Sequence, residues 1–319
     1  MNCKSIILLI VVLLFWGNAE ARKKKGKKVE EVQTESAYRK FFKGKACETA
    51  KGMITLHKMD GRVYFEIPLA LMGREMLMGS TISEITNNGF GSVGEKPKGL
   101  LYISFVRCDS VISLKQLTAQ YDTNEENLKQ RIKESTIPAT IKNFKITTYN
   151  EDSTAVVIDM TDYLVSADEA IDPFSPWAPI LAGGERVMEK EFRRENSQVV
   201  SIKAFEDNVS VKSSLTYGLS LKNKVMYIFQ REPFTAVMTR SFILLPEHPM
   251  RPRLADPRIA IFSQGVSVFN GDSRGAQARY YAQRWNLEPK DMEQYRKGVL
   301  TEPKKPIVFY VDNTFPENW

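Results

Sequence analysis

The side chains that most often carry out chemistry are few in this chain and lie far apart. There are two histidines, His57 and His248. H-E-x-x-H places two imidazoles on one helical face around zinc, with the glutamate as general base, and the sequence does not contain this motif. Cys47 and His57 could form a nucleophile and its base, but no orienting or oxyanion-stabilising group is apparent beside them. We therefore interpret both histidines as ordinary surface or boundary residues.

The cysteines Cys47 and Cys108 follow the N-terminal apolar run, and their spacing fits no metal or redox motif. One disulfide between them and two buried free thiols remain open as alternatives.

Two further patterns suggest ligand binding, and we reject both. Residues 89–94 match G-x-G-x-x-G, but Pro97 follows where a dinucleotide site needs a helix to begin. We interpret residues 87–98 as a Gly-rich loop. The acidic residues at 168–172 lack the spacing of an EF-hand and predict a plain surface loop. The sequence thus predicts no catalytic, cofactor-binding or metal-binding residue in this chain.

The N-terminus has the parts of a secretory signal peptide. Lys4 precedes an apolar run from Ile6 to Trp16, and Ala19-Glu20-Ala21 is a small-x-small cleavage site. The run is shorter than the ~20 residues that a membrane span needs. We expect residues 1–21 to be removed after Ala21. This predicts export to the periplasm or outer envelope, or secretion.

A basic run follows the signal peptide. Six of the seven residues at 22–28 are Lys or Arg, so most of the net charge of +7 comes from this run. A nucleic-acid interface would spread basic residues over a folded face with aromatics between them, so we predict no nucleic-acid partner. Residues 22–35 are interpreted as a basic linker, with weak contact to an anionic membrane surface as the alternative.

The remaining sequence predicts an α+β fold dominated by antiparallel strands, arranged as a meander or sandwich, with few helices. Residues 36–86 predict a small domain made of a helix and a β-hairpin that turns at Asp60-Gly61. Residues 99–290 predict a β-rich domain, with a helix at 124–135 and successive strands from 198 to 245. Residues 291–319 are interpreted as a linker and the first strand of a further domain.

Two stretches are candidates for contact with another domain. Arg251, Arg253, Asp256 and Arg258 alternate with prolines that hold the backbone extended; an interdomain clamp and a solvated crossover loop are equally favoured. Ile307–Val311 is an apolar run typical of a strand buried on both faces, with Ile307, Phe309 and Val311 among its members. A helix start follows this run, as though a new domain opened there.

Several motifs resemble one family, that of large bacterial exported zinc-dependent metallopeptidases. They are Leu245-Pro246-Glu247-x-Pro249-Met250-x-Pro252-Arg253-x-x-Asp256-Pro257-Arg258-Ile259, Arg284-Trp285-x-Leu287-Glu288 and Pro306-Ile307-Val308-Phe309-Tyr310-Val311-Asp312. The resemblance spans nearly all of Tyr38–Trp319. It implies that the strand at 307–311 opens a zincin domain whose H-E-x-x-H lies beyond this chain. Zinc is then expected only in that catalytic domain, and no catalytic residue of the family falls on any position here.

We therefore expect an exported, non-catalytic N-terminal region of a zinc metallopeptidase-like protein. Its partner would be a zincin-like catalytic domain, in cis or in trans, on which it packs. The alternative is a free-standing cell-envelope binding module without peptidase activity.

The first testable prediction concerns processing. Mass analysis of the N-terminus in envelope fractions should find Arg22 as the first residue, because the signal peptide ends at Ala21. An intact Met1 on a cytoplasmic species would contradict it.

Overall fold

The computed structural model describes residues 35–118, 121–123, 125–175, 187–222, 232–270 and 275–309. All but the first two of these residues belong to one compact unit, Ala37–Trp319. The predicted signal peptide, its cleavage site at Ala21 and the basic run at 22–28 lie outside the described residues, as does Val311.

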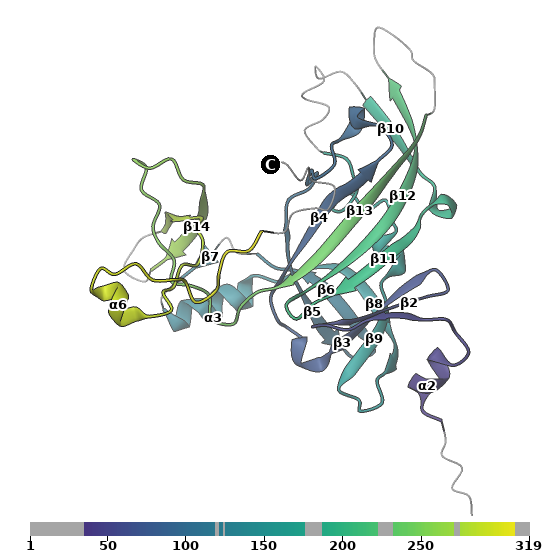
Figure 1. Ribbon diagram of the computed structural model, residues 1–319, viewed down its shortest axis with the longest axis horizontal. Coiled ribbons are helices and arrows are strands. Elements are labelled where there is room, and N and C mark those ends of the chain that lie inside the picture. The colour runs from purple at the N-terminus through teal and green to yellow at the C-terminus, as the bar shows by residue number, and fades with distance from the viewer. Residues whose placement is uncertain are drawn as a thin grey trace, which may run out of the picture. The chain divides into compact units, whose positions relative to one another are not determined.

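A twelve-stranded sheet dominates the fold, in the order β1-β2-β3-β9-β8-β6-β5-β4-β13-β12-β10, and β11 also pairs with β12 (Figure 1). Its strands are β1 (Glu48–Ala50), β2 (Thr55–Met59), β3 (Arg62–Pro68), β4 (Met76–Ile85), β5 (Leu101–Cys108), β6 (Val111–Gln116), β8 (Ala139–Tyr149), β9 (Ala155–Asp159), β10 (Val187–Phe192), β11 (Gln198–Ala204), β12 (Asn208–Lys222) and β13 (Glu232–Leu244). All the pairings are antiparallel. The predicted fold class is therefore confirmed. The segments 36–86 and 99–290, predicted as separate domains, both supply strands to this sheet.

Local turn chemistry explains the hairpins. In the β2–β3 hairpin, Met59 pairs with Arg62, and the two turn residues Asp60 and Gly61 have φ of 53° and 71°. Two successive positive φ values match the twist of the flanking strands, which is why Asp-Gly favours such turns. The β5–β6 turn likewise places Asp109 at a φ of 48°. The hairpin predicted at Asp60-Gly61 is therefore confirmed.

The sheet curves so that its apolar face encloses a core. Phe65 on β3 and Phe242 on β13 lie on strands that are far apart in the sheet order, yet their ring centroids are 5.4 Å apart. The two ends of the sheet also meet, because the Met53 N–H donates to the Phe205 carbonyl at 2.8 Å and the Lys58 ammonium donates to the Val200 carbonyl at 2.6 Å. β11 is thereby brought against β1 and β2.

The segment 161–174 fills part of the core, which corrects the prediction of a surface loop at 168–172. It begins with α4 (Thr161–Leu164) and buries Tyr163, Ile171 and Phe174. Asp172 is only 1% exposed and forms ion pairs with two lysines. The acidic and proline-rich composition indicated a loop correctly but did not reveal that this loop folds inward.

A second, three-stranded sheet has the order β15-β14-β7. It consists of β7 (Tyr121–Asp122), β14 (Ser263–Phe269) and β15 (Ala276–Ala282). β14 pairs with β15 in an antiparallel and with β7 in a parallel arrangement. Within the run of strands predicted from 198 to 245, residues 223–231 lie outside the described residues.

The helical elements are short. They are α2 (Ala37–Phe42), α3 (Glu126–Ser135), α4, α6 (Met292–Arg296) and the 3₁₀ turns η1 (Leu69–Leu71), η2 (Asn88–Phe90) and η3 (Arg194–Asn196). The predicted helices at 36–44 and 124–135 are confirmed in α2 and α3. Within the described ranges, every helix is too short or too polar to span a lipid bilayer.

The second prediction tests the closure of the sheet. At Gly52, an added Cβ would lie 2.6 Å from the Phe205 backbone nitrogen, and neither backbone can give way cheaply. Gly52→Ala should lower the free energy of unfolding by ~1–3 kcal/mol, measured by urea denaturation. Gly99→Ala is the control, because nothing lies within 4 Å of its added Cβ. Equal stability of the two variants would contradict the proposed close approach.

Candidate interdomain surface

The proline-rich stretch lies along β15. Leu254 forms a β-bridge with Tyr281, the Ala255 N–H donates to the Tyr280 carbonyl at 2.8 Å, and the Ala282 N–H donates to the Arg253 carbonyl at 2.8 Å. The prolines keep this stretch extended, so it can run beside a strand. The stretch is therefore attached to the small sheet through its backbone.

The four charged residues predicted as interdomain contacts occupy the outside of this stretch. Arg258 binds both carboxylate oxygens of Asp256, and this pair holds the pKa of Asp256 below its usual range. Arg251 accepts a hydrogen bond from Arg284 through its backbone carbonyl, at 2.7 Å. All four residues lie at or near the surface, which is compatible with both the clamp and the solvated loop.

The structure brings together the last two motifs of the resemblance. The rings of Trp285 and Phe309 meet edge to face, with centroids 6.2 Å apart. Lys304 and Glu288 also contact each other twice. Their side chains form an ion pair, and the Lys304 backbone N–H donates to the Glu288 carbonyl at 2.7 Å. These contacts close a loop around α6, whose N-terminus is capped by the Asp291 carboxylate.

An unusual amount of apolar surface is exposed between residues 246 and 309. Among the described residues of this range, Val268 is the only buried one. Most of the large apolar side chains here are instead at least 36% exposed; Phe262 is 86%, Leu300 is 99% and Phe309 is 78% exposed. The exposed set is Met250, Leu254, Ile259, Ile261, Phe262, Tyr280, Trp285, Leu287, Met292, Tyr295, Val299, Leu300, Ile307, Val308 and Phe309. We call this set the C-terminal apolar surface.

These exposed side chains make this region a candidate contact surface. Scattered apolar residues on a surface are normal, but a concentration of large ones marks an interaction site. Ile307 and Phe309, both predicted as contacts, belong to it. Residues 307–309 are in no strand, so the predicted strand at 307–311 is not formed in its described part.

A buried polar cluster lies under α2, and it corrects the interpretation of His57. The side chain of His57 is only 6% exposed. Its Nε2 is 3.0 Å from a Glu66 carboxylate oxygen, its Nδ1 is 3.0 Å from the Thr49 hydroxyl, and Phe42 of α2 packs on the ring. The carboxylate can only accept, so Nε2 carries a proton and donates it to Glu66. The Tyr38 hydroxyl donates to the same carboxylate at 2.7 Å.

Cys47, His57 and Glu66 follow one another as a nucleophile, a base and an orienting acid would, but their geometry favours a structural role. The Cys47 sulfur is 3.9 Å from Nδ1, farther than the Thr49 hydroxyl that already occupies this nitrogen. Tyr38 and Phe42 cover the cluster from α2. We infer that Tyr38, His57 and Glu66 hold α2 on the outer face of the sheet. Sequence missed this because the three residues are brought together only by strand pairing and by the helix above it.

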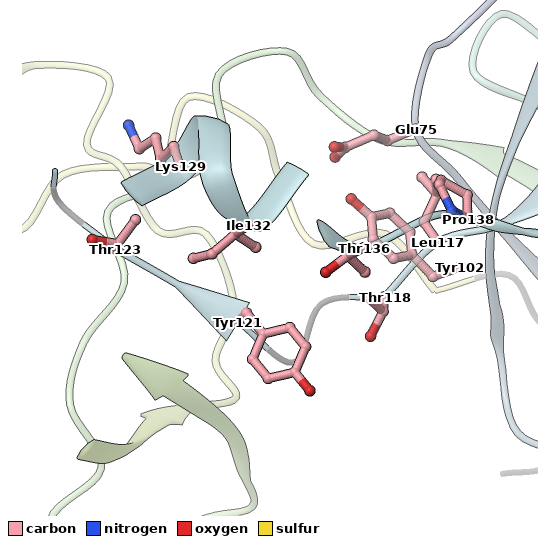
Figure 2. A pocket seen from close by; sticks show the side chains of 10 residues that line it. All are labelled: Glu75, Tyr102, Leu117, Thr118, Tyr121, Thr123, Lys129, Ile132, Thr136 and Pro138. Carbon is pink, nitrogen blue, oxygen red and sulfur yellow. The ribbon is translucent and has the colours of Figure 1, made fainter. Parts of the chain in front are cut away.

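Another feature that sequence did not predict is a cavity of about 320 Å³ beside α3. Figure 2 shows Glu75 and Tyr102 on one side and Lys129 of α3 on another. Burial and a hydrogen bond to Glu75 raise the pKa of Tyr102. The lining residues are Glu75, Tyr102, Leu117, Thr118, Tyr121, Thr123, Lys129, Ile132, Thr136 and Pro138. Its size suits a small ligand, but the lining shows no nucleophile with an adjacent base.

In the part of the chain that the structure describes, no group of three or more His, Cys, Asp or Glu side chains is placed to hold a metal ion. Cys47 and Cys108 are both free, so the two thiols are not joined in a disulfide.

Comparison with known proteins gives a family for this architecture. Residues 95–290 match the family described as "Domain of unknown function (DUF5117)", and residues 35–85 match "Domain of unknown function (DUF5118)". The first match covers more than half of the chain, which therefore belongs to the DUF5117 family. No curated protein and no solved structure matches the chain.

The third prediction concerns the cluster under α2. Hydrogen bonding to His57 holds the pKa of Glu66 below its usual range. A lowered folded-state pKa contributes stability above the unfolded value of about 4.3 and loses it as pH falls through the folded value. The wild type should therefore lose melting temperature below about pH 4.5, and Glu66→Gln should lose less over that range. Glu48→Gln on the neighbouring β1 is the control. An unchanged pH profile in Glu66→Gln would refute the assignment.

Proposed function

We propose that this chain is the exported, non-catalytic N-terminal region of a zinc metallopeptidase-like protein, and that it packs on and positions a zincin-like catalytic domain. The catalytic domain is supplied in cis or in trans. The observation that carries the proposal is the C-terminal apolar surface, whose side chains are exposed in the part of the chain that the structure describes.

The composition of this surface suits a lasting contact. Protein interfaces are enriched in aromatic residues, Met and Arg, and the surface contains Phe262, Trp285 and Phe309 beside Arg251 and Arg253. Each Å² of apolar surface removed from water contributes about 25 cal/mol, so covering these residues would favour association. The surface also includes 307–309, where the resemblance expects the catalytic domain to begin.

The proposal assigns roles to the other parts of the chain. Zinc and the catalytic residues belong to the partner domain. The basic run at 22–28 serves as a tether after export, with a weak attraction to anionic headgroups.

A second candidate is a free-standing binding module of the cell envelope. The cavity beside α3 favours it, because a module that acts alone needs a ligand site of its own. The two candidates differ in whether the C-terminal apolar surface is covered by another domain.

The fourth prediction tests the proposal with two exposed residues of that surface. The H-E-x-x-H domain encoded immediately downstream or in an adjacent gene is purified, and its binding to this chain is measured by calorimetry. The double variant Phe262→Ser/Leu300→Ser should weaken binding about tenfold, since the loss of two large apolar contacts costs ~1–2 kcal/mol. The melting temperature of this double variant should stay within about 1 °C of that of the wild type, because both side chains are exposed.

Ile137→Ser is the matched control, since Ile137 is 85% exposed but lies outside the surface. It should bind like the wild type. The proposal fails if the wild type does not bind the catalytic domain, or if Ile137→Ser weakens binding as much as the double variant does.

A further inference from the structure

The cavity beside α3 contains a carboxylate whose charge is not balanced by a cation. Glu75 lines the cavity, and in the part of the chain that the structure describes its side chain forms no ion pair. The neighbouring Arg74 is paired with Glu247 instead, at 2.6 Å. The Tyr102 hydroxyl donates to Glu75 and stays protonated, because burial and this contact raise the pKa of Tyr102. A neutral donor stabilises the negative charge but does not cancel it.

Lys129 is the cation among the lining residues, and it is directed elsewhere. Its ammonium pairs with Glu126 on the preceding turn of α3, at 3.3 Å, and its side chain is 53% exposed. Figure 2 shows this ammonium pointing away from the Glu75 carboxylate and the Tyr102 hydroxyl. The cavity therefore retains the negative charge of Glu75.

The end of α3 that lines the cavity adds to the negative potential. Ile132 lies in the last turn of this helix, and Thr136 is its C-cap. The carbonyl groups at a helix C-terminus carry a partial negative charge and favour a cation nearby. The Thr136 hydroxyl can also accept a hydrogen bond from an ammonium group. Both features point to a positively charged ligand.

The remaining lining suits an apolar body. Leu117, Ile132 and Pro138 supply aliphatic surface, and Tyr102 and Tyr121 supply aromatic rings. An aromatic face attracts cations as well as apolar groups. The volume of about 320 Å³ is at the lower end of the range for small-molecule sites. A compact ligand with one charged end and one apolar end fits this lining.

We propose that this cavity is a binding site for a small organic ammonium ion with an apolar body. The ammonium group donates to the Glu75 carboxylate and to the Thr136 hydroxyl, while the body packs on Ile132 and on the ring of Tyr121. Glu75 is exposed, so water solvates its charge until the ligand replaces that water.

This inference goes beyond the proposed contact with a catalytic domain. None of the lining residues belongs to the C-terminal apolar surface, so the binding of the amine and of the domain can fail separately. The inference also gives a ligand class to the cavity that favours a free-standing binding module.

The experiment measures binding of phenethylamine to the purified chain by calorimetry, at neutral pH and low ionic strength. The dissociation constant should be on the order of 0.1–1 mM. Phenethyl alcohol has the same shape without the charge and should bind about tenfold more weakly, because hydrogen bonds between charged groups are stronger. Hydrocinnamate, which carries a carboxylate, should bind still more weakly.

A lysine side chain is another source of an ammonium group. Nα-acetyl-lysine methylamide presents this group on a peptide backbone and should bind more weakly than phenethylamine, because it has no aromatic body to place against the tyrosine rings. Tighter binding of the capped lysine would overturn the free amine as the ligand.

Two charge-removing variants test the role of Glu75. Glu75→Gln should weaken the binding of phenethylamine about tenfold and remove its advantage over phenethyl alcohol. Glu134→Gln is the matched control, because Glu134 is also exposed and lies on α3 but does not line the cavity. It should bind phenethylamine within about twofold of the wild type.

Methyl spectra of isoleucine-labelled protein locate the ligand. The Ile132 methyl signal should shift as phenethylamine is added, because this side chain lines the cavity, whereas the signal of Ile137, which is 85% exposed outside the lining, should not. The proposal is overturned if phenethylamine does not bind by ~10 mM, or if phenethyl alcohol or hydrocinnamate binds as tightly. Equal weakening in Glu75→Gln and Glu134→Gln, or an unshifted Ile132 signal at saturation, would also overturn it.

Discussion

The fold depends on enclosing the apolar face of one large antiparallel sheet. Phe65 and Phe242 can meet only because the sheet bends until strands that are distant in its order face each other. The bend is completed where the backbone at Gly52 passes directly against Phe205. The segment 161–174 fills part of the space inside. Its Ile171 carbonyl accepts a hydrogen bond from the buried Arg240 guanidinium. The closure of the sheet, the insertion of the segment 161–174 and the burial of Arg240 therefore depend on one another.

Sequence predicted best what is decided locally. Asp60-Gly61 specifies its turn through two residues with positive φ, and the alternation along β13 specifies which face is buried. His57 and Asp172 were misjudged because their burial is decided by contacts distant in sequence: the packing of α2 in one case and the insertion of the segment 161–174 into the core in the other. No local pattern reports such contacts. The apolar run at 307–311 was recognised, but its composition predicted burial, whereas Ile307, Val308 and Phe309 are exposed among the described residues.

The chain contains two regions of different character. From β1 to β13, large side chains such as Phe105 and Tyr217 are fully buried in a continuous core. From residue 246 onwards, the described part of the chain is held mainly by backbone hydrogen bonds, ring contacts and ion pairs at the surface. Local stability follows buried apolar contact, so the second region should open more readily than the first. A partner that covers it would also rigidify it.

The proline-rich stretch beside β15 has a consequence for self-assembly. β15 is the outer strand of the small sheet, and an open strand edge is a template for pairing with another copy of the chain. Here Arg253, Leu254 and Ala255 already occupy that edge, and the prolines at 252 and 257 offer no N–H to a newcomer. The region can therefore expose apolar side chains while the outer edge of β15 is protected against strand pairing with another copy.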